Sequence, residues 1–397
     1  MKVAIFHNLP SGGAKRALYE FSKELQRRGF LLDAFIPSTA NEEFLPLDEV
    51  VHRKFVYPVK LFPPSIDLMG FRWMHHKGLL LSHVVNQKHI ASEINNRDYA
   101  LAFVHHSIIT QSPFILRYLR IPSLYYIQEP LRFVHEHRLI AEPIPLSFRR
   151  SFLLNVHGLF SNALIKSIDE SNTLHASRIL VNSSYSHESV MRAYGVNSYV
   201  SYLGVDAERF RPDENTKKEN MVLSVGSISQ FKGFRFILKA MGKLRSKPRL
   251  VIIGDRDNHD ERTVLTALAG ENHVDMEIKV GVSDSELIGH YNKAMMTVYA
   301  PYLEPFGFVP LEAMACGTPV IGVGEGGVRE SIVNGTTGMI VERDPDKFAD
   351  AIEYLMQSPD KRRSMGKNAI EFVRERWTWE KATDNLVAHF DAVLRKG

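Results

Sequence analysis

The stretch Glu304-Pro305-Phe306-Gly307-Phe308-Val309-Pro310-Leu311-Glu312 decides how this sequence is interpreted. It places two carboxylates eight positions apart, across a turn that contains proline and glycine. The apolar run 296–300 before it predicts a strand, and 309–315 predicts a helix. A strand, a tight loop and a helix in this order form a crevice at the carboxyl edge of a parallel sheet, where α/β proteins bind ligands.

The same stretch carries groups that suit a phosphorylated sugar. The first backbone N–H groups of a helix favour an anion such as a diphosphate. On the loop, Glu304 can accept hydrogen bonds from sugar hydroxyls, and Glu312 in the helix can hold a ribose. These groups together predict a nucleotide-sugar ligand.

Length and composition limit the class of protein. A chain of 397 residues exceeds what one core usually serves, so we expect two domains of roughly 200 residues. The single cysteine, Cys316, excludes an internal disulfide framework and a four-cysteine metal site, and its neighbours favour a buried packing role. Residues 1–7 predict a first strand rather than a signal peptide. No run approaches the ~18 apolar residues of a membrane span, so we expect a cytoplasmic protein.

Charge is distributed unevenly along the chain. Residues 1–200 contain 22 Lys and Arg against 16 Asp and Glu, a net of +6, and the remainder has a net of −2. A basic first half favours phosphate-bearing partners, including an anionic membrane surface at which the protein would be peripheral. Aromatic and basic residues in 54–89 and 149–154 could form such a surface for a lipid-linked acceptor. A lid, ordinary packing or a merely uneven surface is the alternative. No nucleic-acid-binding motif is visible.

Strand-like and helix-like segments alternate in both halves. In the first half, strands are expected at 3–7, 31–36, 101–105, 123–127 and 179–183, with helices at 14–28 and 186–194. In the second half, strands are expected at 221–225, 249–253, 274–280, 296–300, 319–322 and 339–341, with helices at 234–244, 283–293, 345–356 and 378–396. This alternation predicts parallel sheets of βαβ units. We therefore expect an α/β protein of two Rossmann-like domains that face each other across a cleft.

Several short motifs occur in a fixed order. They are Gly12-Gly13, Val225-Gly226, Lys232-Gly233, the Glu304/Glu312 pair, 313–320, 326–330 and 335–338. Together they resemble the retaining glycosyltransferase family 4, of GT-B fold. The resemblance implies an acceptor-side domain at 1–200 and a nucleotide-sugar-binding domain at 201–376. It also implies a helix at 377–397 that crosses back onto the first domain.

The resemblance also implies an activity. Such an enzyme moves a sugar from a nucleoside diphosphate, UDP- or GDP-linked, to a hydroxyl of a glycan, a glycolipid or a small molecule. It needs neither a divalent metal nor another cofactor.

Site residues follow from the resemblance position by position. Lys232 and Glu304 would be catalytic. The fixed ammonium of Lys232 would stabilise the charge of the departing diphosphate, and Glu304 would hold hydroxyls of the donor sugar. The expected donor-binding residues are Gly12, Gly13, Gly226, Ser227, Lys232, Glu304, Phe306, Gly307, Phe308 and Glu312. The expected residues on the sugar or acceptor side are Gln128, Glu129, Arg132 and His106.

Two positions depart from the family pattern. Ser227 stands where an arginine is usual, so one of the two cations that would bind the diphosphate is missing. Helix N-termini, or one of Arg235, Arg256 and Arg329, could take the place of this cation. Gln128 stands where a histidine is common. Glutamine can bind a sugar hydroxyl but cannot accept a proton. That fits a retaining mechanism, in which the leaving phosphate oxygen takes the proton of the acceptor.

Other functions are left open by these residues. A non-catalytic nucleotide-sugar-binding protein is one, because of the two departures, and a nucleotide-sugar epimerase of the same fold is another. An NAD-dependent oxidoreductase would need Gly-x-Gly-x-x-Gly after a strand, which the Gly12-Gly13 loop does not provide. The fragment His135-Glu136-His137 has poor spacing for metal ligands, so we expect no metal site.

Overall fold

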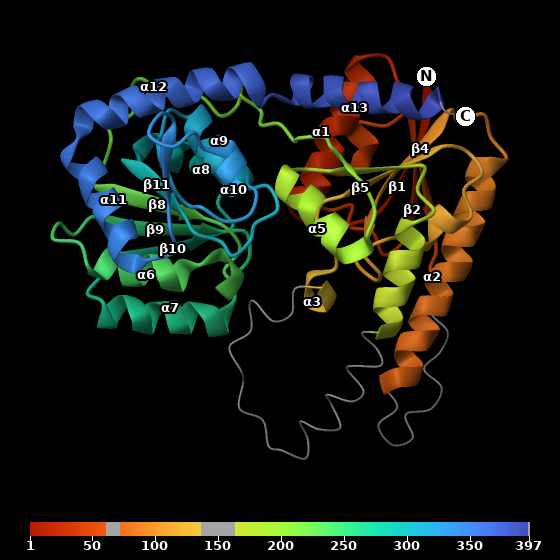
Figure 1. The fold of residues 1–397 in the computed structure, drawn as a ribbon, viewed down its shortest axis with the longest axis horizontal. Helices are drawn as coiled ribbons and strands as arrows, with labels where there is room; N and C mark the ends of the chain where they lie inside the picture. The colour runs from red at the N-terminus through yellow and green to blue at the C-terminus, as the bar shows by residue number, and fades with distance from the viewer. Residues whose placement is uncertain (61–71, 136–162, 396–397) are drawn as a thin grey trace. The chain divides into compact units, whose positions relative to one another are not determined.

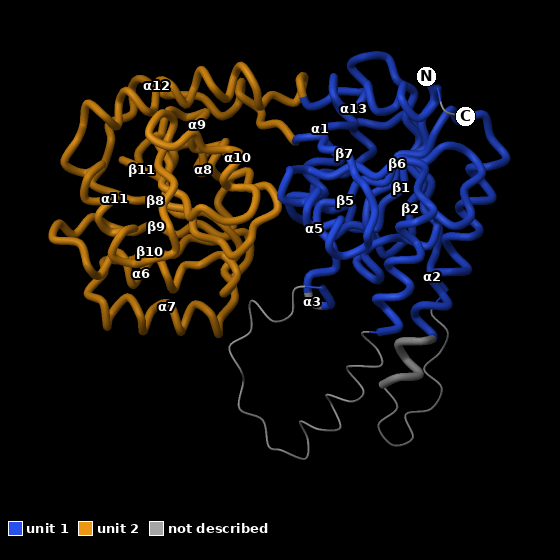
Figure 2. The backbone as a smooth tube through the Cα atoms, viewed as in Figure 1, with its two compact units in different colours: residues 1–202, 382–397 blue, residues 203–381 orange. Residues whose placement is uncertain are grey.

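The computed structural model describes residues 1–60, 72–135 and 163–395. The chain forms two compact units, residues 1–202 with 382–397 and residues 203–381 (Figure 2). Of the segments that the sequence singled out, parts of 54–89 and 135–137 and all of 149–154 lie outside the described residues.

Unit 1 contains a seven-stranded parallel sheet in the order β3-β2-β1-β4-β5-β6-β7 (Figure 1). Its strands are β1 (Lys2–Asn8), β2 (Leu31–Pro37), β3 (Arg53–Tyr57), β4 (Leu101–Ser107), β5 (Ser123–Ile127), β6 (Arg178–Val181) and β7 (Tyr199–Val200). The strand order reverses between β1 and β4, and in such sheets ligands bind at the carboxyl ends of the strands at this point. The five strands expected in this half are confirmed.

Helices surround this sheet. They are α1 (Gly13–Arg27), α2 (Arg72–Asn95), α3 (Arg132–His135), a helix at 163–173, α5 (Ser184–Tyr194) and α13 (Trp379–Leu394), with 3-10 turns η1 (Leu47–Glu49) and η2 (Phe114–Arg117). In α1, the apolar positions at helical spacing, Ala17, Leu18, Phe21 and Leu25, are buried. In α5, the Ser183 side chain accepts a hydrogen bond from Ser186 N–H, and Gly195 ends the helix in the left-handed conformation.

The C-terminal helix belongs to unit 1, as expected. In α13, Phe390 is fully buried, and its ring lies 5.7 Å from that of Phe103 and 6.2 Å from that of Phe30. Arg28 Nη1 donates to Asp384 Oδ1 at 2.7 Å. The last helix therefore completes the core of the unit that contains the N-terminus.

Unit 2 contains a six-stranded parallel sheet in the order β10-β9-β8-β11-β12-β13. Its strands are β8 (Met221–Val225), β9 (Arg249–Gly254), β10 (Met276–Val280), β11 (Met296–Tyr299), β12 (Val320–Val323) and β13 (Gly338–Val341). Its helices are α6 (Phe234–Gly242), α7 (His259–Glu271), α8 (Asp284–Lys293), α9 (Phe308–Ala315), α10 (Val328–Ser331), α11 (Pro345–Gln357) and α12 (Pro359–Arg376), with one 3-10 turn, η3 (Gln230–Lys232). All six strands expected in this half are confirmed, and the strand order reverses between β8 and β11.

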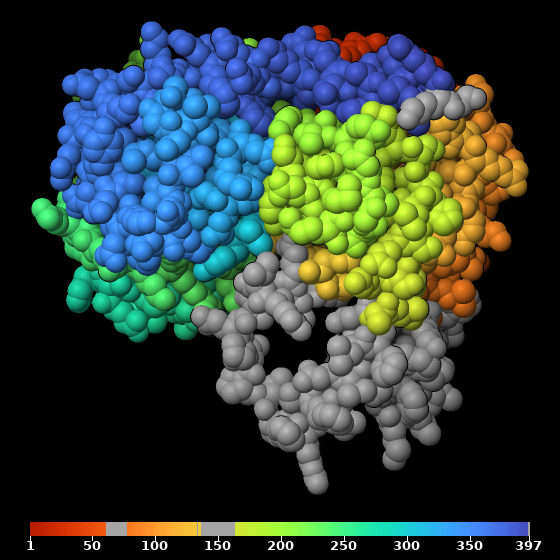
Figure 3. Space-filling model, viewed as in Figure 1, coloured from red at the N-terminus to blue at the C-terminus, as the bar shows by residue number. Residues whose placement is uncertain are grey.

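The core of unit 2 lies between the sheet and its helices. The strands β8, β9 and β12 are almost continuously buried, which is typical of a parallel sheet covered on both faces. The dark blue atoms of α12 lie along the surface of this unit (Figure 3). Cys316 is buried, and burial raises the pKa of its thiol to about 12, which agrees with the expected packing role. Within the described ranges, no helix is both long and apolar enough to cross a membrane.

Asp169, in the helix at 163–173, is a fully buried carboxylate in unit 1. Its Oδ1 accepts a hydrogen bond from Ser112 N–H at 2.8 Å, and its Oδ2 accepts one from Tyr194 Oη at 2.7 Å. Burial outweighs these hydrogen bonds and raises the pKa of Asp169 to about 6. The folded protein therefore holds a proton that the unfolded chain has lost over a window of roughly pH 4 to 6.

We expect Asp169→Asn to gain stability relative to the wild type as the pH rises through this window. Between pH 4 and 6 the folded wild type binds more protons than the unfolded chain. Its unfolding free energy therefore falls by up to about 3 kcal/mol as the pH rises through this range, and this decrease is absent from the variant. Urea unfolding of both proteins at the two ends of the window measures the difference. The exposed Asp391→Asn is the control, and parallel pH profiles for wild type and Asp169→Asn would show that this carboxylate does not titrate as stated.

Candidate functional site

The two residues expected to be catalytic contact each other in unit 2. Lys232 Nζ, at the end of η3, donates to Glu304 Oε2 at 2.7 Å, although the residues are 72 positions apart in the chain. The two side chains are 23% and 20% exposed. Part of each charged group is therefore accessible to a ligand at the carboxyl edge of the sheet.

A close approach of backbone segments fixes this pair. Gly233 follows Lys232 with φ +72°, and a Cβ there would lie 1.9 Å from the carbonyl oxygen of Ala300. Tyr302 N–H donates to the carbonyl of Phe231 at 2.9 Å. Because only glycine fits at position 233, the Lys232 turn can lie directly against the loop that leads to Glu304.

The glycine pair Gly326-Gly327 supports the loop that contains Glu304. Gly327 N–H donates to the carbonyl of Glu304 at 2.8 Å. A Cβ at Gly326 would lie 2.3 Å from Glu304 O, and one at Gly327 would lie 2.2 Å from Pro305 O. The turn between β12 and α10 therefore forms one side of the Glu304 loop.

The start of α9 lies directly after this loop. Gly307 caps the helix with φ +87°, and no side chain there accepts a hydrogen bond from the first turn. The Phe306 ring is buried against the rings of Trp377 and Phe308, at 5.7 and 5.3 Å. Phe306 thus anchors the loop by its side chain, so a role in donor binding would fall to the backbone.

The second carboxylate, Glu312, lies in α9 and is almost fully buried. Tyr291 Oη donates to Glu312 Oε2 at 2.9 Å, a partner that the sequence did not reveal. Burial, and then the charges of Glu304 and Glu312, raise the pKa of Tyr299 well above its usual value. Both carboxylates therefore act on one tyrosine at the end of β11.

The turn after β8 contains Gly226 and Ser227. A Cβ at Gly226 would lie 3.2 Å from Lys232 Cγ, so this glycine leaves room for the lysine side chain. Ser227 Oγ lies 3.5 Å from Ser229 Oγ. Two of the residues expected to bind the donor, Gly226 and Glu304, thus lie directly beside Lys232.

Three arginines were candidates to replace the cation missing at Ser227. Arg235 is held by Glu261 through two hydrogen bonds of 3.0 and 2.7 Å, so its charge is neutralised. The side chain of Arg329 donates to the carbonyl of Gly326 at 3.1 Å, next to the Glu304 loop. Arg256 is exposed in the turn after β9. Among the three, Arg329 has a contact that ties it to this loop.

In unit 1, Gly12 and Gly13 lie where β1 passes into α1. Gly12 caps the helix with φ +133°, without a hydrogen bond from a capping side chain. A Cβ at Gly12 would meet nothing within 4 Å. Glycine is thus required by the backbone conformation, and the space beside it is open.

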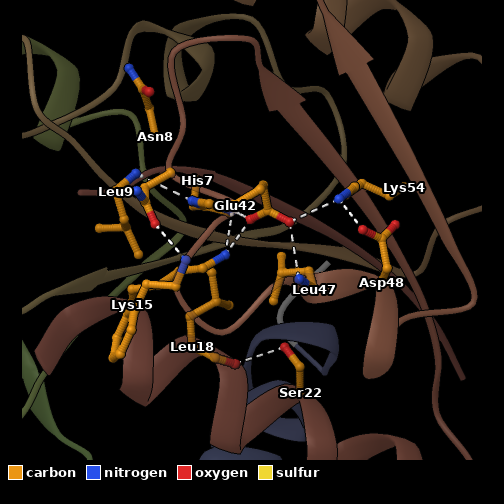
Figure 4. A network of polar contacts seen from close by, with 12 residues as sticks. His7, Asn8, Leu9, Lys15, Leu18, Ser22, Glu42, Leu47, Asp48 and Lys54 are labelled. Atoms are coloured by element: carbon orange, nitrogen blue, oxygen red, sulfur yellow. Dashed lines mark hydrogen bonds and ion pairs between the residues drawn. The ribbon is translucent and has the colours of Figure 1, made fainter. Parts of the chain in front are cut away.

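A buried network of charges holds the segments on both sides of this glycine turn (Figure 4). His7 at the end of β1 and Lys15 in the first turn of α1 are both fully buried, and both contact Glu42 Oε1. Leu9 N–H donates to His7 Nδ1 at 3.2 Å, and Asn41 N–H donates to the carbonyl of Leu9 at 3.0 Å. The carboxylate of Glu42 therefore joins the residues before and after Gly12-Gly13.

Glu42 is fully hydrogen-bonded in this network. Its Oε2 accepts from Leu47 N–H at 3.0 Å and from Lys54 Nζ at 3.1 Å. Although burial opposes it, the hydrogen bonds from His7 and Lys15 hold the pKa of Glu42 below its usual value. Burial lowers the pKa of His7 to about 4, so this imidazole is neutral at physiological pH. The sequence interpretation missed His7, Lys15 and Glu42, since their spacing carries no recognisable signal.

We expect Glu42→Gln to destabilise the protein more than Lys15→Met does. The amide leaves the Lys15 ammonium buried without a carboxylate, at a cost of roughly 2–3 kcal/mol. Methionine removes that charge, and Glu42 keeps its contacts with His7, Leu47 and Lys54. Urea unfolding of the two variants measures the order. Equal losses, or a larger loss for Lys15→Met, would contradict it.

The residues expected on the sugar or acceptor side lie in unit 1, at the ends of β4 and β5. Gln128 is buried, and its Oε1 accepts a hydrogen bond from Asn182 Nδ2 at 2.8 Å. Its Nε2 has no hydrogen-bond partner among the described residues. Arg132 Nη1 lies 3.7 Å from Glu129 Oε2. Gln128 thus presents a donor group, beside a carboxylate and a guanidinium that form an ion pair.

The adjacent histidines of β4 are both buried. The His105 ring lies 4.6 Å from that of Phe103 and 5.5 Å from that of Tyr126, so it takes part in packing. Burial lowers the pKa of His106 to about 4. A neutral His106 donates a hydrogen bond from one ring nitrogen and accepts one at the other.

In the part of the chain that the structure describes, no group of three or more His, Cys, Asp or Glu could hold a metal ion.

Two Rossmann-like units, with a C-terminal helix that returns to the first, define a protein of the GT-B fold class. Residues 206–372, which lie within unit 2, match the family model for glycosyl transferases group 1. This match confirms the resemblance seen in the sequence over that part of the chain.

Curated relatives match over about half of this chain. A D-inositol 3-phosphate glycosyltransferase from Segniliparus rotundus is 29% identical over 217 residues, which are 49% of this chain and 46% of the relative. One from Catenulispora acidiphila is 30% identical over 220 residues, which are 49% and 52% of the two chains. The chain thus spans about half the length of the curated relatives it matches.

Two solved structures match over essentially the whole chain. A sucrose-phosphate synthase from Thermosynechococcus elongatus has a TM-score of 0.77 at 19% identity, covering 100% of both chains. HepE from Anabaena, solved with UDP and glucose, has a TM-score of 0.73 at 15% identity, covering 99% of this chain and 100% of HepE. At this identity the likeness confirms the fold.

Proposed function

We propose that this protein is a retaining glycosyltransferase that moves a sugar from a nucleoside diphosphate to an acceptor hydroxyl without a divalent metal. The observation that carries the proposal is the contact between Lys232 and Glu304. It lies at the carboxyl edge of a parallel sheet, inside the part of the chain that matches the family model for glycosyl transferases group 1.

In this proposal, Lys232 stabilises the departing diphosphate. Negative charge develops on the phosphate oxygens as the bond to the sugar breaks, and a fixed ammonium lowers the energy of that state. The N–H groups at the start of α9 add a favourable field for an anion. Without a donor, Glu304 compensates the lysine charge; with a donor, its carboxylate can accept hydrogen bonds from sugar hydroxyls.

Retention is implied by the family resemblance, and the expected sugar-side residues are compatible with it. Gln128 cannot take a proton, which fits a mechanism in which the leaving phosphate oxygen takes the proton of the acceptor hydroxyl. The bond from the anomeric carbon to that oxygen breaks, and the bond to the acceptor oxygen forms on the same face. Glu312 would hold the ribose through its carboxylate.

Substrates are proposed only by class. The donor is a UDP- or GDP-linked sugar, and the solved complex of HepE with UDP-glucose makes this the first donor to test. The acceptor is a glycan, a lipid-linked sugar or a small molecule. The net charge of +6 in residues 1–200 favours an anionic membrane surface as a further partner.

A nucleotide-sugar-binding protein without turnover is the second candidate, favoured by Ser227 and Gln128, where the usual arginine and histidine are missing. An epimerase would need further acid and base carboxylates near the sugar. Turnover separates these candidates, since a binding protein releases no nucleotide.

A donor screen in the presence of EDTA tests the proposal. We expect one class among UDP-, GDP- and ADP-sugars to raise the melting temperature of the wild type, and to raise that of Glu304→Ala much less. The control is Glu371→Ala, which removes an exposed glutamate of α12 and should respond like the wild type. No stabilisation by any donor would contradict the nucleotide-sugar site.

A further inference from the structure

Arg343 lies in the short loop between β13 and α11, and its guanidinium is largely enclosed, with 16% of the side chain exposed. Its Nε and Nη2 donate to Glu325 Oε1 and Oε2, at 2.7 and 2.8 Å. This two-pronged geometry fixes the plane of the guanidinium as well as its position.

The same guanidinium holds the start of the Glu304 loop. Its Nη1 donates to the carbonyl of Ala300 at 2.9 Å, and its Nη2 donates to the carbonyl of Pro301 at 2.7 Å. Its central carbon lies 3.9 Å from the centroid of the Tyr302 ring. Arg343 therefore contacts three consecutive residues between β11 and Glu304.

Two partners of Arg343, Tyr302 and Glu325, are connected to the Lys232–Glu304 pair through one or two further residues. Tyr302 N–H donates to the carbonyl of Phe231, the neighbour of Lys232. Glu325 precedes Gly326-Gly327, and Gly327 N–H donates to the carbonyl of Glu304. Arg343 thus fixes the Glu304 loop directly at its beginning, and through Glu325 at the glycine turn that supports it.

The contacts also show what Arg343 does not do. Four of the five guanidinium N–H groups are used within the protein, and the charge is paired with Glu325. It is therefore not the cation that replaces the arginine missing at Ser227. Lysine could not reproduce these contacts, since an ammonium has neither the planar fork nor the stacking surface.

We propose that Arg343 is a positioning residue for the transfer reaction: it sets the place of the Glu304 carboxylate, and so the contact between Lys232 and Glu304. The inference rests on the proposed function for its kinetic consequence. Because small displacements of a positioned group are costly, we expect Arg343→Lys to lower the turnover number by up to about 100-fold. Binding of the free nucleoside diphosphate should change little, because Arg343 contacts no group assigned to the nucleotide.

A double-mutant cycle with Glu304→Gln tests this role. If Arg343 acts through Glu304, Arg343→Lys should lower the turnover number much less when Glu304 is already replaced by glutamine. In that background we expect a loss of less than about threefold. Arg249→Lys is the matched control, since Arg249 pairs with Glu277 at 2.9 Å on β9 of the same unit and should not affect turnover. Equal losses in both backgrounds, or a fully active Arg343→Lys, overturn the inference.

A crystal structure of Arg343→Lys gives a second readout that needs no donor. We expect the segment 300–305 to be displaced, the hydrogen bond between Lys232 and Glu304 to be broken, and the sheet to be unchanged. A loop that superimposes on the wild type overturns the inference even if the protein proves inactive. Failure of the wild type to bind any nucleotide sugar would instead overturn the proposed function, so the two can fail separately.

Discussion

Replacing Lys232 by methionine is expected to lower the turnover number of nucleotide release by about 10²–10³-fold. Methionine keeps most of the length of the side chain against Gly226 and removes the ammonium that we propose stabilises the diphosphate. The missing interaction matters most when charge develops on the leaving group, so the turnover number should fall more than donor affinity. Initial rates of nucleotide release over a range of donor concentrations separate the two effects.

The control for this prediction is Lys239→Met, which removes an exposed lysine of α6 in the same unit. It should leave both parameters within about twofold of the wild type. A loss of less than about threefold for Lys232→Met would show that this ammonium does not stabilise the departing diphosphate.

Replacing Gly326 by alanine is expected to cost about 3–5 kcal/mol of unfolding free energy. The left-handed conformation at φ +59° accounts for about 1–2 kcal/mol of this loss. The overlap of the new Cβ with Glu304 O at 2.3 Å, which is rigid backbone, accounts for the rest. Since the Glu304 loop must move, nucleotide release should fall as well.

Gly335→Ala is the matched control for this second prediction. Gly335 also has a positive φ, +76°, but a Cβ there would meet nothing within 4 Å. Gly335→Ala should therefore lower the unfolding free energy only by the conformational part, about 1–2 kcal/mol, and leave the activity unchanged. Urea unfolding of both variants measures the difference, and equal costs would mean that the contact with the Glu304 loop adds nothing.

The strands and most helices could be predicted because their apolar residues repeat at regular spacing. β11 and α9, on either side of the Glu304 loop, are clear in the sequence for this reason. The strand β3 was missed because it is an edge strand with only partial burial, and β7 because it has two residues. These edges carry little of the hydrophobic pattern that identifies a central strand.

The candidate site could be predicted only where short motifs mark it. Lys232 and Glu304 were named from such motifs, and the structure places them in contact. Arg343 could not be found in this way, because its partners are brought together by the fold and are not linked by spacing in the sequence. Lys15 is similar, since its position in an amphipathic helix gives no sign that its ammonium is buried.

The missing arginine at Ser227 has a partial explanation in the structure. Arg235, the nearest alternative in the sequence, is neutralised by Glu261, whereas Arg329 lies at the glycine turn that supports Glu304. We therefore expect Lys232 and the start of α9 to contribute most of the stabilisation of the diphosphate, with Arg329 beside them.

The most direct test of the central claim is a transfer assay with the donor that stabilises the wild type, in EDTA and with mixed glycan, lipid-linked and small-molecule acceptors. Nucleotide release and the mass of the products are followed together. We expect nucleoside diphosphate and a product heavier by one sugar residue, both strongly reduced in Glu304→Ala. A donor that binds tightly but yields neither product would contradict a transferase and identify a nucleotide-sugar-binding protein.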